Sequence, residues 1–168
     1  NPFGTASDSC LFNESAAAGL HGIRNTPTIT LATTGQYTIS CWLKPGTRNF
    51  GGFFLDFSAI SFAALWNLTT GANTRANVFA GSSALFSTAV AVGTRPTPSV
   101  AGWRQYFATI EVTNLPPAAF FASVNMSSAG TALSYVGTVG QTIEVWPSPV
   151  DGPTIRNMLG KPLTVEPL

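Results

Sequence analysis

The clearest alternation of apolar and polar residues in this chain runs from Gly35 to Pro45. Every second residue is apolar: the apolar set is Tyr37, Ile39, Cys41 and Leu43, and the residues between are Thr38, Ser40, Trp42 and Lys44. A period of two is typical of a strand that buries one face. The pattern therefore predicts a half-buried strand over 35–45, whose second face carries hydroxyls, an indole and a cation.

Further apolar runs of strand length follow, and turns that contain glycine or proline separate them about every ten residues. The predicted strands are 6–13, 21–31 (as an edge strand or two short strands), 49–58, 61–68, 77–80, 84–92, 105–113, 118–125 and 141–146, with a closing strand around 163–166. We expect a loop at 94–98 and no helix of significant length, since residues 15–20 are too few to form one unsupported. This arrangement predicts an all-β fold, a β-sandwich of jelly-roll type.

Composition agrees with this class. The chain has 168 residues, of which 45% are hydrophobic and 9% are charged. Low charge does not indicate disorder here, because disordered chains are poor in aromatic and β-branched residues and this chain is rich in both. The length suits a single domain over 1–168 with a sizeable core.

Charge and hydropathy bear on the partners. The net charge is +1 and no Lys/Arg cluster occurs, so there is no electrostatic case for binding nucleic acid. No apolar run approaches the roughly eighteen residues of a membrane span, so we expect no membrane insertion. The chain begins at Asn1 without an initiator Met or a signal-like region, and we expect it to be a piece of a longer polypeptide.

Five short blocks stand in order along the chain. They are Pro2-Phe3-Gly4-Thr5-Ala6-Ser7, then Gly35-x-Tyr37-Thr38-x-Ser40-x-x-x-Lys44, Asn67-Leu68-Thr69-Thr70-Gly71, Gly102-Trp103-Arg104, and Ser134-Tyr135 to Gly140 followed by Ile143-Glu144-Val145-Trp146. Together they resemble blocks of the carbohydrate-binding-module-like jelly-roll domains of phage tail fibres and tailspikes. In that family the late Trp is followed by Gly and then by Gln-Leu-Glu, whereas this chain has Pro147 and lacks that triplet.

The resemblance implies a galactose-binding or carbohydrate-binding-module-like sandwich that binds a host cell-surface glycan or receptor without catalysis. The alternative is a structural module that trimerises or caps the fibre without binding sugar. Either role implies a homotrimer in the virion, outside the host cell. The residues also suggest an oligomer, because the neighbours in Phe53-Phe54 and Phe120-Phe121 point to opposite faces of a strand, so one of each pair needs a partner outside the core.

Sugar rings stack on flat aromatic side chains while polar groups bind their hydroxyls. Trp42 shares its strand face with Ser40 and Lys44, so these three are candidate ligand-binding residues, unless a neighbouring loop covers the indole. Arg104 is the fourth candidate, with structural pairing to Glu111 or Asp56 as the alternative. We expect the other three tryptophans to pack, Trp66 in the core and both Trp103 and Trp146 at the ends of the sandwich.

Catalysis and metal binding have little support. Asp56, Glu111 and Glu144 could meet across strands, but nothing in their spacing requires the carboxylate pair of a glycosidase. His21 lacks a nucleophile motif, so we expect no enzymatic activity and no catalytic residues.

No spacing of cysteine and histidine indicates a metal, and we expect no cofactor. A structural calcium in the Asp8 or Asp151 loop is an alternative that no EF-hand-like run supports. Cys10 and Cys41 are interpreted as two buried thiols rather than as a disulfide.

Overall fold

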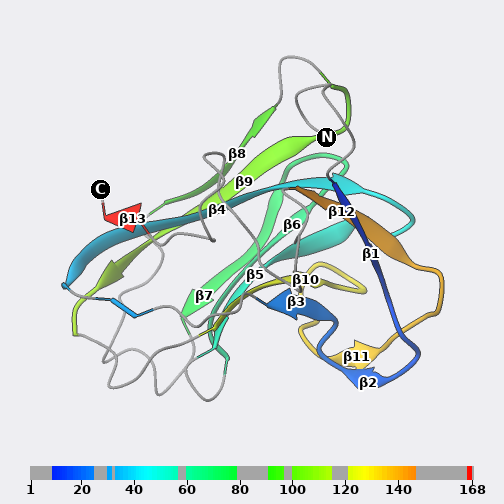
Figure 1. The fold of residues 1–168 in the computed structure, drawn as a ribbon, viewed down its shortest axis with the longest axis horizontal. Coiled ribbons are helices and arrows are strands. Elements are labelled where there is room, and N and C mark those ends of the chain that lie inside the picture. The colour runs from blue at the N-terminus through cyan, green and yellow to red at the C-terminus, as the bar shows by residue number, and fades with distance from the viewer. Residues whose placement is uncertain are drawn as a thin grey trace.

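The computed structural model describes residues 9–24, 30–31, 33–56, 60–78, 91–96, 100–114, 121–146 and 166–167. Within these residues every regular element is a strand, and antiparallel pairing joins the strands into two large sheets packed face to face (Figure 1). The predicted all-β sandwich is therefore confirmed, while its jelly-roll type stays a prediction. The entry block at 2–7 and the two loops around Asp8 and Asp151 lie outside the described residues.

The first sheet has β4 near its centre. Its strands lie in the order β1 (Cys10–Asn13), β12 (Thr142–Trp146), β4 (Gly35–Pro45), β9 (Arg104–Val112) and β8 (Ala91–Pro96), and β13 (Glu166–Pro167) pairs with the other end of β4. Because β12 pairs with 42–45 of β4 and β13 pairs with 37–38, two short strands share one edge of the long one.

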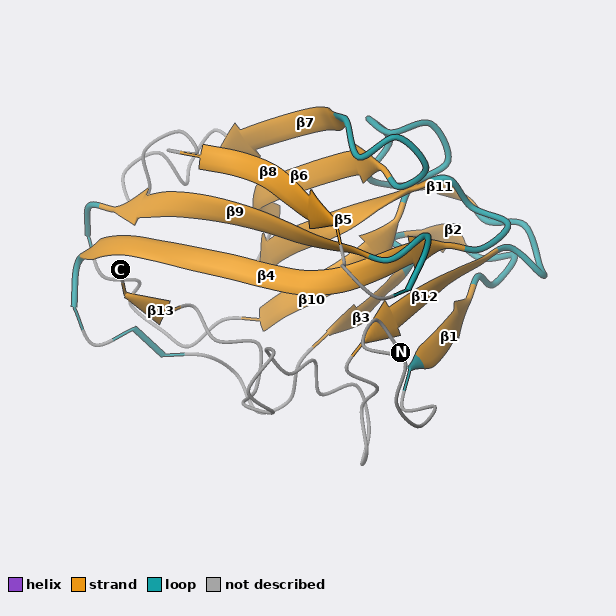
Figure 2. Ribbon diagram, turned by 90° about the horizontal axis from the view of Figure 1, so that it is seen from above, coloured by secondary structure: helices purple, strands orange, loops and turns teal. Residues whose placement is uncertain are grey.

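The second sheet is five-stranded. Its order is β3 (Gly22–Arg24), β10 (Phe121–Met126), β5 (Phe50–Asp56), β6 (Ile60–Asn67) and β7 (Asn73–Val78). Figure 2 shows β8, β9 and β4 of the first sheet passing in front of β6, β5 and β10 of the second. A small third sheet pairs β2 (Ala18–Gly19) with β11 (Tyr135–Val136) at one end of the sandwich.

One predicted loop is wrong. Residues 94–96 continue strand β8, which pairs with β9 up to the Pro96–Arg104 partners. Proline is tolerated here because β8 is an edge strand, where a missing N–H on the open side breaks no ladder bond.

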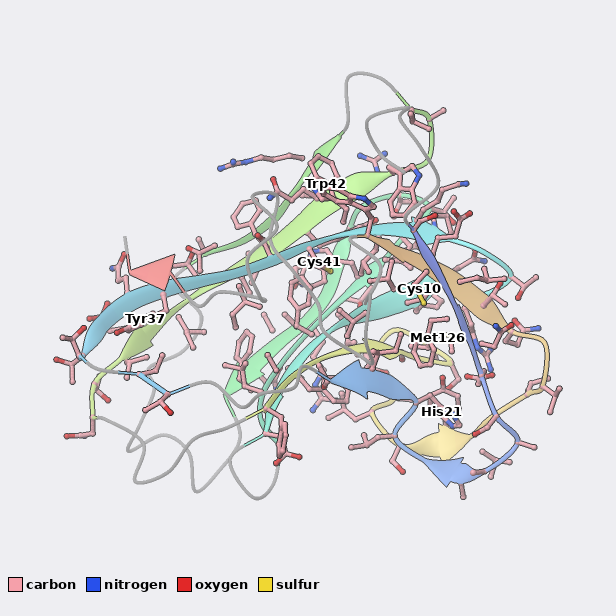
Figure 3. All side chains as sticks on the ribbon, in the orientation of Figure 1. Cys10, His21, Tyr37, Cys41, Trp42 and Met126 are labelled. Carbon is pink, nitrogen blue, oxygen red and sulfur yellow. The ribbon has the colours of Figure 1, made fainter. Side chains whose placement is uncertain are left out.

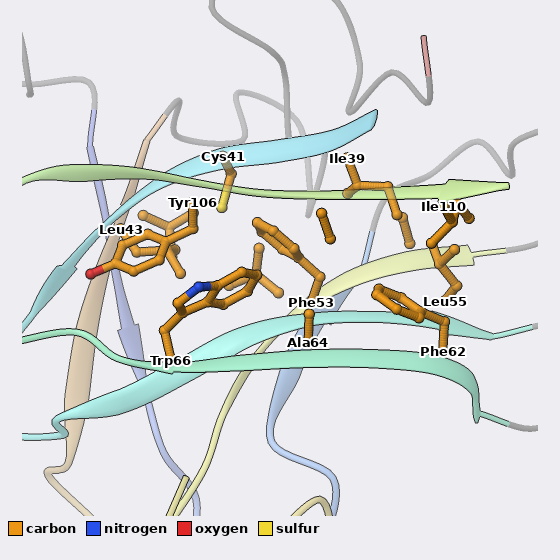
Figure 4. Packing of buried hydrophobic residues seen from close by; sticks show 14 of the residues in the cluster. Ile39, Cys41, Leu43, Phe53, Leu55, Phe62, Ala64, Trp66, Tyr106 and Ile110 are labelled. Atoms are coloured by element: carbon orange, nitrogen blue, oxygen red, sulfur yellow. The ribbon is translucent and has the colours of Figure 1, made fainter. Parts of the chain in front are cut away.

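The core lies between the two sheets, and alternate residues of their strands fill it. The apolar set of β4, Tyr37, Ile39, Cys41 and Leu43, faces inward as its alternation predicts. Trp66 of β6 meets it from the opposite sheet, with its ring centroid 5.3 Å from that of Phe53 and 5.4 Å from that of Tyr106, both in edge-on geometry (Figure 4). The prediction that Trp66 belongs to the core is confirmed.

A smaller apolar cluster lies on the outer face of the five-stranded sheet. Phe54, Ala63 and Leu65 are buried there, and Leu133 from the segment 127–134 packs against them. Thr74 and Arg75 of β7 hold this segment by donating hydrogen bonds to the carbonyls of Gly130, at 2.7 Å, and of Thr131, at 2.6 Å. Phe53 and Phe54 do face opposite ways, but Phe54 finds its partners within the chain, so this pair gives no argument for a trimer. Phe120 lies outside the described residues.

Truncating the central indole tests this account of the core. We expect Trp66→Ala to lower the free energy of unfolding by about 3 to 5 kcal/mol, because the change leaves a large cavity. Urea unfolding followed by circular dichroism measures the loss. Val139→Ala is the control, since Val139 is 73% exposed and its truncation should change the free energy by less than about 0.5 kcal/mol.

Candidate functional site

A cleft with a volume of about 340 Å³ opens at the end of the sandwich where β4 ends and β9 begins. Three segments line it, contributing Pro45, then Leu68 and Thr69, then Val100, Ala101, Gly102, Trp103 and Arg104. We call this cavity the end cleft. Two of the blocks that carry the family resemblance, 67–71 and 102–104, therefore contribute to its walls.

The turn between β6 and β7 forms one wall of the end cleft. The Asn67 side-chain oxygen accepts hydrogen bonds from the backbone N–H groups of Thr69, at 3.0 Å, and of Thr70, at 3.1 Å. Gly71 then adopts a φ of +80°, which favours glycine, and closes the turn by donating its N–H to the Asn67 carbonyl at 2.7 Å. Residues 67–71 therefore form the hairpin turn between β6 and β7, and the asparagine side chain caps it.

Tyr106 of β9 ties this turn to the opposite sheet. Its hydroxyl donates a hydrogen bond of 3.0 Å to the Leu68 carbonyl. Burial raises the pKa of this hydroxyl far above its usual value, and the nearby positive charge of Arg104 opposes the rise. The tyrosine therefore remains neutral and holds the turn that forms one wall of the end cleft.

Arg104 is the sequence-predicted site residue that this cleft contains. Arg104 and Tyr106 are two residues apart on β9, so both side chains point to the inward side of the strand. The half-buried Arg104 lies at the end of the sandwich, in the end cleft. Arg104 lies against this turn. A Cβ atom built on Gly71 would be 3.4 Å from the guanidinium carbon of Arg104. The predicted pairing with Glu111 or Asp56 is not observed, and no ion pair of Arg104 occurs within the described chain.

Lys44 lies near the same end of the sandwich but already has a partner. Its Nζ is 2.7 Å from Glu144 Oε1, directly across the β4–β12 pair, and 5.9 Å from the centre of the Trp103 ring. The side chains of Lys44 and Glu144 are 32% and 28% exposed, so the pair adds at most about 1 kcal/mol to stability. A ligand that used this ammonium group would compete with Glu144 for it.

The prediction that Trp42 offers an exposed stacking surface is wrong. Trp42 does lie on the opposite side of β4 from Cys41 (Figure 3), but only 5% of it is exposed. It sits in the middle of the sheet, between Trp146 on β12 and Gln105 on β9, so the indole has neighbours on both sides. Ser40 is half-buried and accepts a 3.4 Å hydrogen bond from Gln105 Nε2. Ser40, Trp42 and Lys44 do not form one open surface.

The three carboxylates considered for catalysis are also dispersed. Glu111 pairs in register with Gln36 and Glu144 with Lys44, so eight residues of β4 separate them, or about 26 Å at about 3.3 Å per residue. Asp56 belongs to the other sheet. Glycoside hydrolysis needs carboxyl groups roughly 5 to 10 Å apart, so Glu111 and Glu144 do not form such a pair.

A buried polar network at the small third sheet was not predicted. Glu14 has a side chain with no exposed surface, and it accepts hydrogen bonds from Arg48 Nη2 at 2.7 Å, from the Thr138 N–H at 2.8 Å and from the Tyr135 hydroxyl. The His21 ring packs on Tyr135, with 4.6 Å between ring centroids. Tyr135 stands in one of the family-like blocks, but no local signal in the sequence links it to Glu14. Because the carboxylate is enclosed, this network joins three connecting segments rather than binding a ligand.

The balance of forces on Glu14 makes the network sensitive to pH. Burial raises the pKa of the Glu14 carboxyl, but the hydrogen bonds from Arg48, Tyr135 and Thr138, together with the charge of Arg48, outweigh burial and lower the pKa below 4.5. The hydrogen bond to Glu14 is the main cause that raises the pKa of Arg48. Both shifts show that the ionised pair is the favoured state.

Within the described part of the chain, no three His, Cys, Asp or Glu side chains lie close enough to hold a metal ion. Cys10 and Cys41 are not joined by a disulfide; Cys41 is buried and Cys10 is partly buried. The same residues contain no helix that is long and apolar enough to cross a membrane.

No family model matches this chain, and no curated protein matches it.

The Glu14 network predicts a specific dependence of stability on pH. Because the carboxyl has a lowered pKa in the folded state, its contribution is complete above its ordinary pKa of 4.5 and is lost as the pH falls through the folded value. We expect Glu14→Gln to cost about 3 kcal/mol at neutral pH and to flatten the decline of stability between about pH 5 and pH 3. Urea unfolding at a series of pH values measures both effects.

The matched control is Glu111→Gln, which changes a partly exposed carboxylate in the same way. We expect this variant to keep the acid-dependent decline of the parent protein. An equal decline in the parent and in Glu14→Gln would show that the buried pair does not cause it.

Proposed function

We propose that this chain is a non-catalytic glycan-binding module of a phage tail fibre or tailspike, and that it binds sugar in the end cleft. The observation that carries the proposal is Arg104, a half-buried cation in a cavity with no ion-pair partner among the described residues. Arginine presents several N–H donors in a planar fork, which suits carboxylates and adjacent hydroxyl oxygens. The order of the five family-like blocks supports the same function.

The rest of the lining suits a sugar. Pro45 and Val100, which are both partly exposed, supply apolar surface for the C–H groups of a ring, and Thr69 also lines the cleft. Sites of this kind combine mostly apolar walls with a few polar groups that orient the ligand. The positive charge of Arg104 favours an acidic sugar, and the volume of about 340 Å³ suits a terminal residue rather than a long chain.

The remaining parts of the proposal rest on the resemblance. The partner is a host cell-surface glycan, and the module acts in the virion, outside the cell, as part of a trimeric fibre. The wide separation of Glu111 and Glu144 supports a module that binds rather than hydrolyses its glycan. A module that only trimerises or caps the fibre would bind no glycan selectively.

A glycan array followed by affinity measurements tests the proposal. We expect selective binding of glycans with acidic terminal residues, and a loss of roughly tenfold to a hundredfold in affinity for Arg104→Ala, because a hydrogen bond to a charged group contributes about 1.5 to 3 kcal/mol. The melting temperature should change little, since Arg104 makes no ion pair in the described chain.

Arg95→Ala is the matched control. Arg95 is an exposed arginine on β8 whose guanidinium lies 5.2 Å from the centre of the Phe107 ring, away from the end cleft lining. This variant should keep the parent affinity. Absence of any selective glycan on the array, or equal binding by Arg104→Ala and the parent, would refute the proposal and favour the structural module.

A further inference from the structure

A second cavity, of about 200 Å³, lies against the edge of the five-stranded sheet formed by β3 and β10. It is lined by Leu20, Gly22, Asp56, Phe121, Ser123 and Asn125. We call it the face pocket. On β10, Phe121, Ser123 and Asn125 alternate with the core residues Ala122, Val124 and Met126, so the face pocket is on the outer side of this sheet. It shares no lining residue with the end cleft.

One carboxylate oxygen of Asp56, in the face pocket, lacks a hydrogen-bond donor among the described residues. Asp56 is the last residue of β5 and pairs in register with Phe121 of β10. Its Oδ1 is buried and has no hydrogen-bond partner among the residues that the structure describes. A buried carboxylate oxygen without a donor is unfavourable, so a ligand that brings a hydroxyl group gains the hydrogen bond that the protein does not make.

Ser123 and Asn125 form a preorganised polar pair further along β10, two and four residues after Phe121, which is the partner of Asp56. Asn125 is 1% exposed, and its Nδ2 donates a 2.6 Å hydrogen bond to Ser123 Oγ. Gly22 on β3 makes room for the amide, because a Cβ at that position would lie 2.0 Å from Asn125 Oδ1. The two side chains are thus held on the sheet before any ligand arrives, which lowers the entropy lost on binding.

The face pocket also has apolar lining residues. Leu20 is 47% exposed, and Phe121 is partly buried beside Asp56. A cavity that combines hydrogen-bond acceptors with an aromatic and an aliphatic side chain suits a pyranose ring, whose hydroxyls lie at its rim and whose C–H groups lie on its faces.

We propose that the face pocket binds one uncharged pyranose ring, whose hydroxyls donate to Asp56 Oδ1 and reach the Asn125–Ser123 pair while its C–H face packs against Phe121 and Leu20. The proposal rests on the proposed glycan-binding function but assigns a separate site with the opposite charge. The carboxylate of Asp56 disfavours acidic sugars, whereas Arg104 in the end cleft favours them. The chain would therefore recognise an acidic and a neutral residue at two places.

Nuclear magnetic resonance of the ¹⁵N-labelled 168-residue chain tests this directly. The neutral probes are methyl α-D-glucopyranoside, methyl α-D-galactopyranoside and methyl α-D-mannopyranoside, and the acidic probe is glucuronate. We expect at least one neutral probe to shift the amide signals of Gly22, Asp56 and Ser123, with a Kd of about 1 mM or weaker because a single ring makes few contacts. The signals of residues 100–104 should move with glucuronate instead.

Variants assign the binding to the carboxylate. Asp56→Asn keeps the shape but loses the charge, and it should weaken binding of the neutral probe by about tenfold or more. Ser123→Ala should also weaken binding, and it provides a second test if Asp56→Asn does not fold. Glu111→Gln on the other sheet and Arg104→Ala in the end cleft should leave the Kd for the neutral probe unchanged.

The inference fails if no neutral probe shifts the face-pocket signals, or if Asp56→Asn or Ser123→Ala binds as tightly as the parent. It also fails if binding needs calcium and disappears in a chelator, because the sugar would then contact a metal ion rather than the carboxylate. Failure of glucuronate to bind at 100–104 would instead count against the end cleft. The two proposals are therefore judged from different signals and different variants.

Discussion

Between the two sheets, the indole of Trp66 packs edge-on against Phe53 from the neighbouring strand and against Tyr106 from the opposite sheet. Burying an aromatic side chain removes about 150 to 250 Å² from water, or about 4 to 6 kcal/mol at about 25 cal/mol per Å². The Trp66 N–H has no hydrogen-bond partner among the described residues, at a cost of about 1 to 3 kcal/mol. Apolar burial therefore outweighs the unpaired donor, and the indole packs across the space between the two sheets.

The same contact positions the end cleft. Tyr106 presents its ring to Trp66 and its hydroxyl to the Leu68 carbonyl, so one side chain serves both the core and the turn. Arg104, two residues earlier on β9, then meets Gly71 of that turn. The end cleft is thus a consequence of how the two sheets are joined at this end of the sandwich.

Charges are sparse in this chain, and their environments differ. Glu14 and Arg48 form a buried pair that links connecting segments, and Lys44 and Glu144 form a partly exposed pair across two strands. Arg104 and Asp56 belong to neither pair, and each lines a cavity. A cation in one cavity and a carboxylate in the other give the two cavities opposite preferences for ligand charge, which is why we assign them different sugars.

The sequence by itself determined the strand at 35–45 and the inward face of its apolar residues, because the period of two is a local property of the extended backbone. It also determined the turn at 67–71, where Asn67 and Gly71 act within a few residues of each other. The polar network and the surroundings of the candidate site residues were decided by the tertiary structure alone. Glu14 meets Arg48 and Tyr135 across 34 and 121 residues, and no local pattern reports contacts at that separation. Trp42 is buried although its strand face is polar, because the exposure of a side chain depends on its neighbours on other strands. Arg104 lines a cleft because the opposite sheet places a turn beside it.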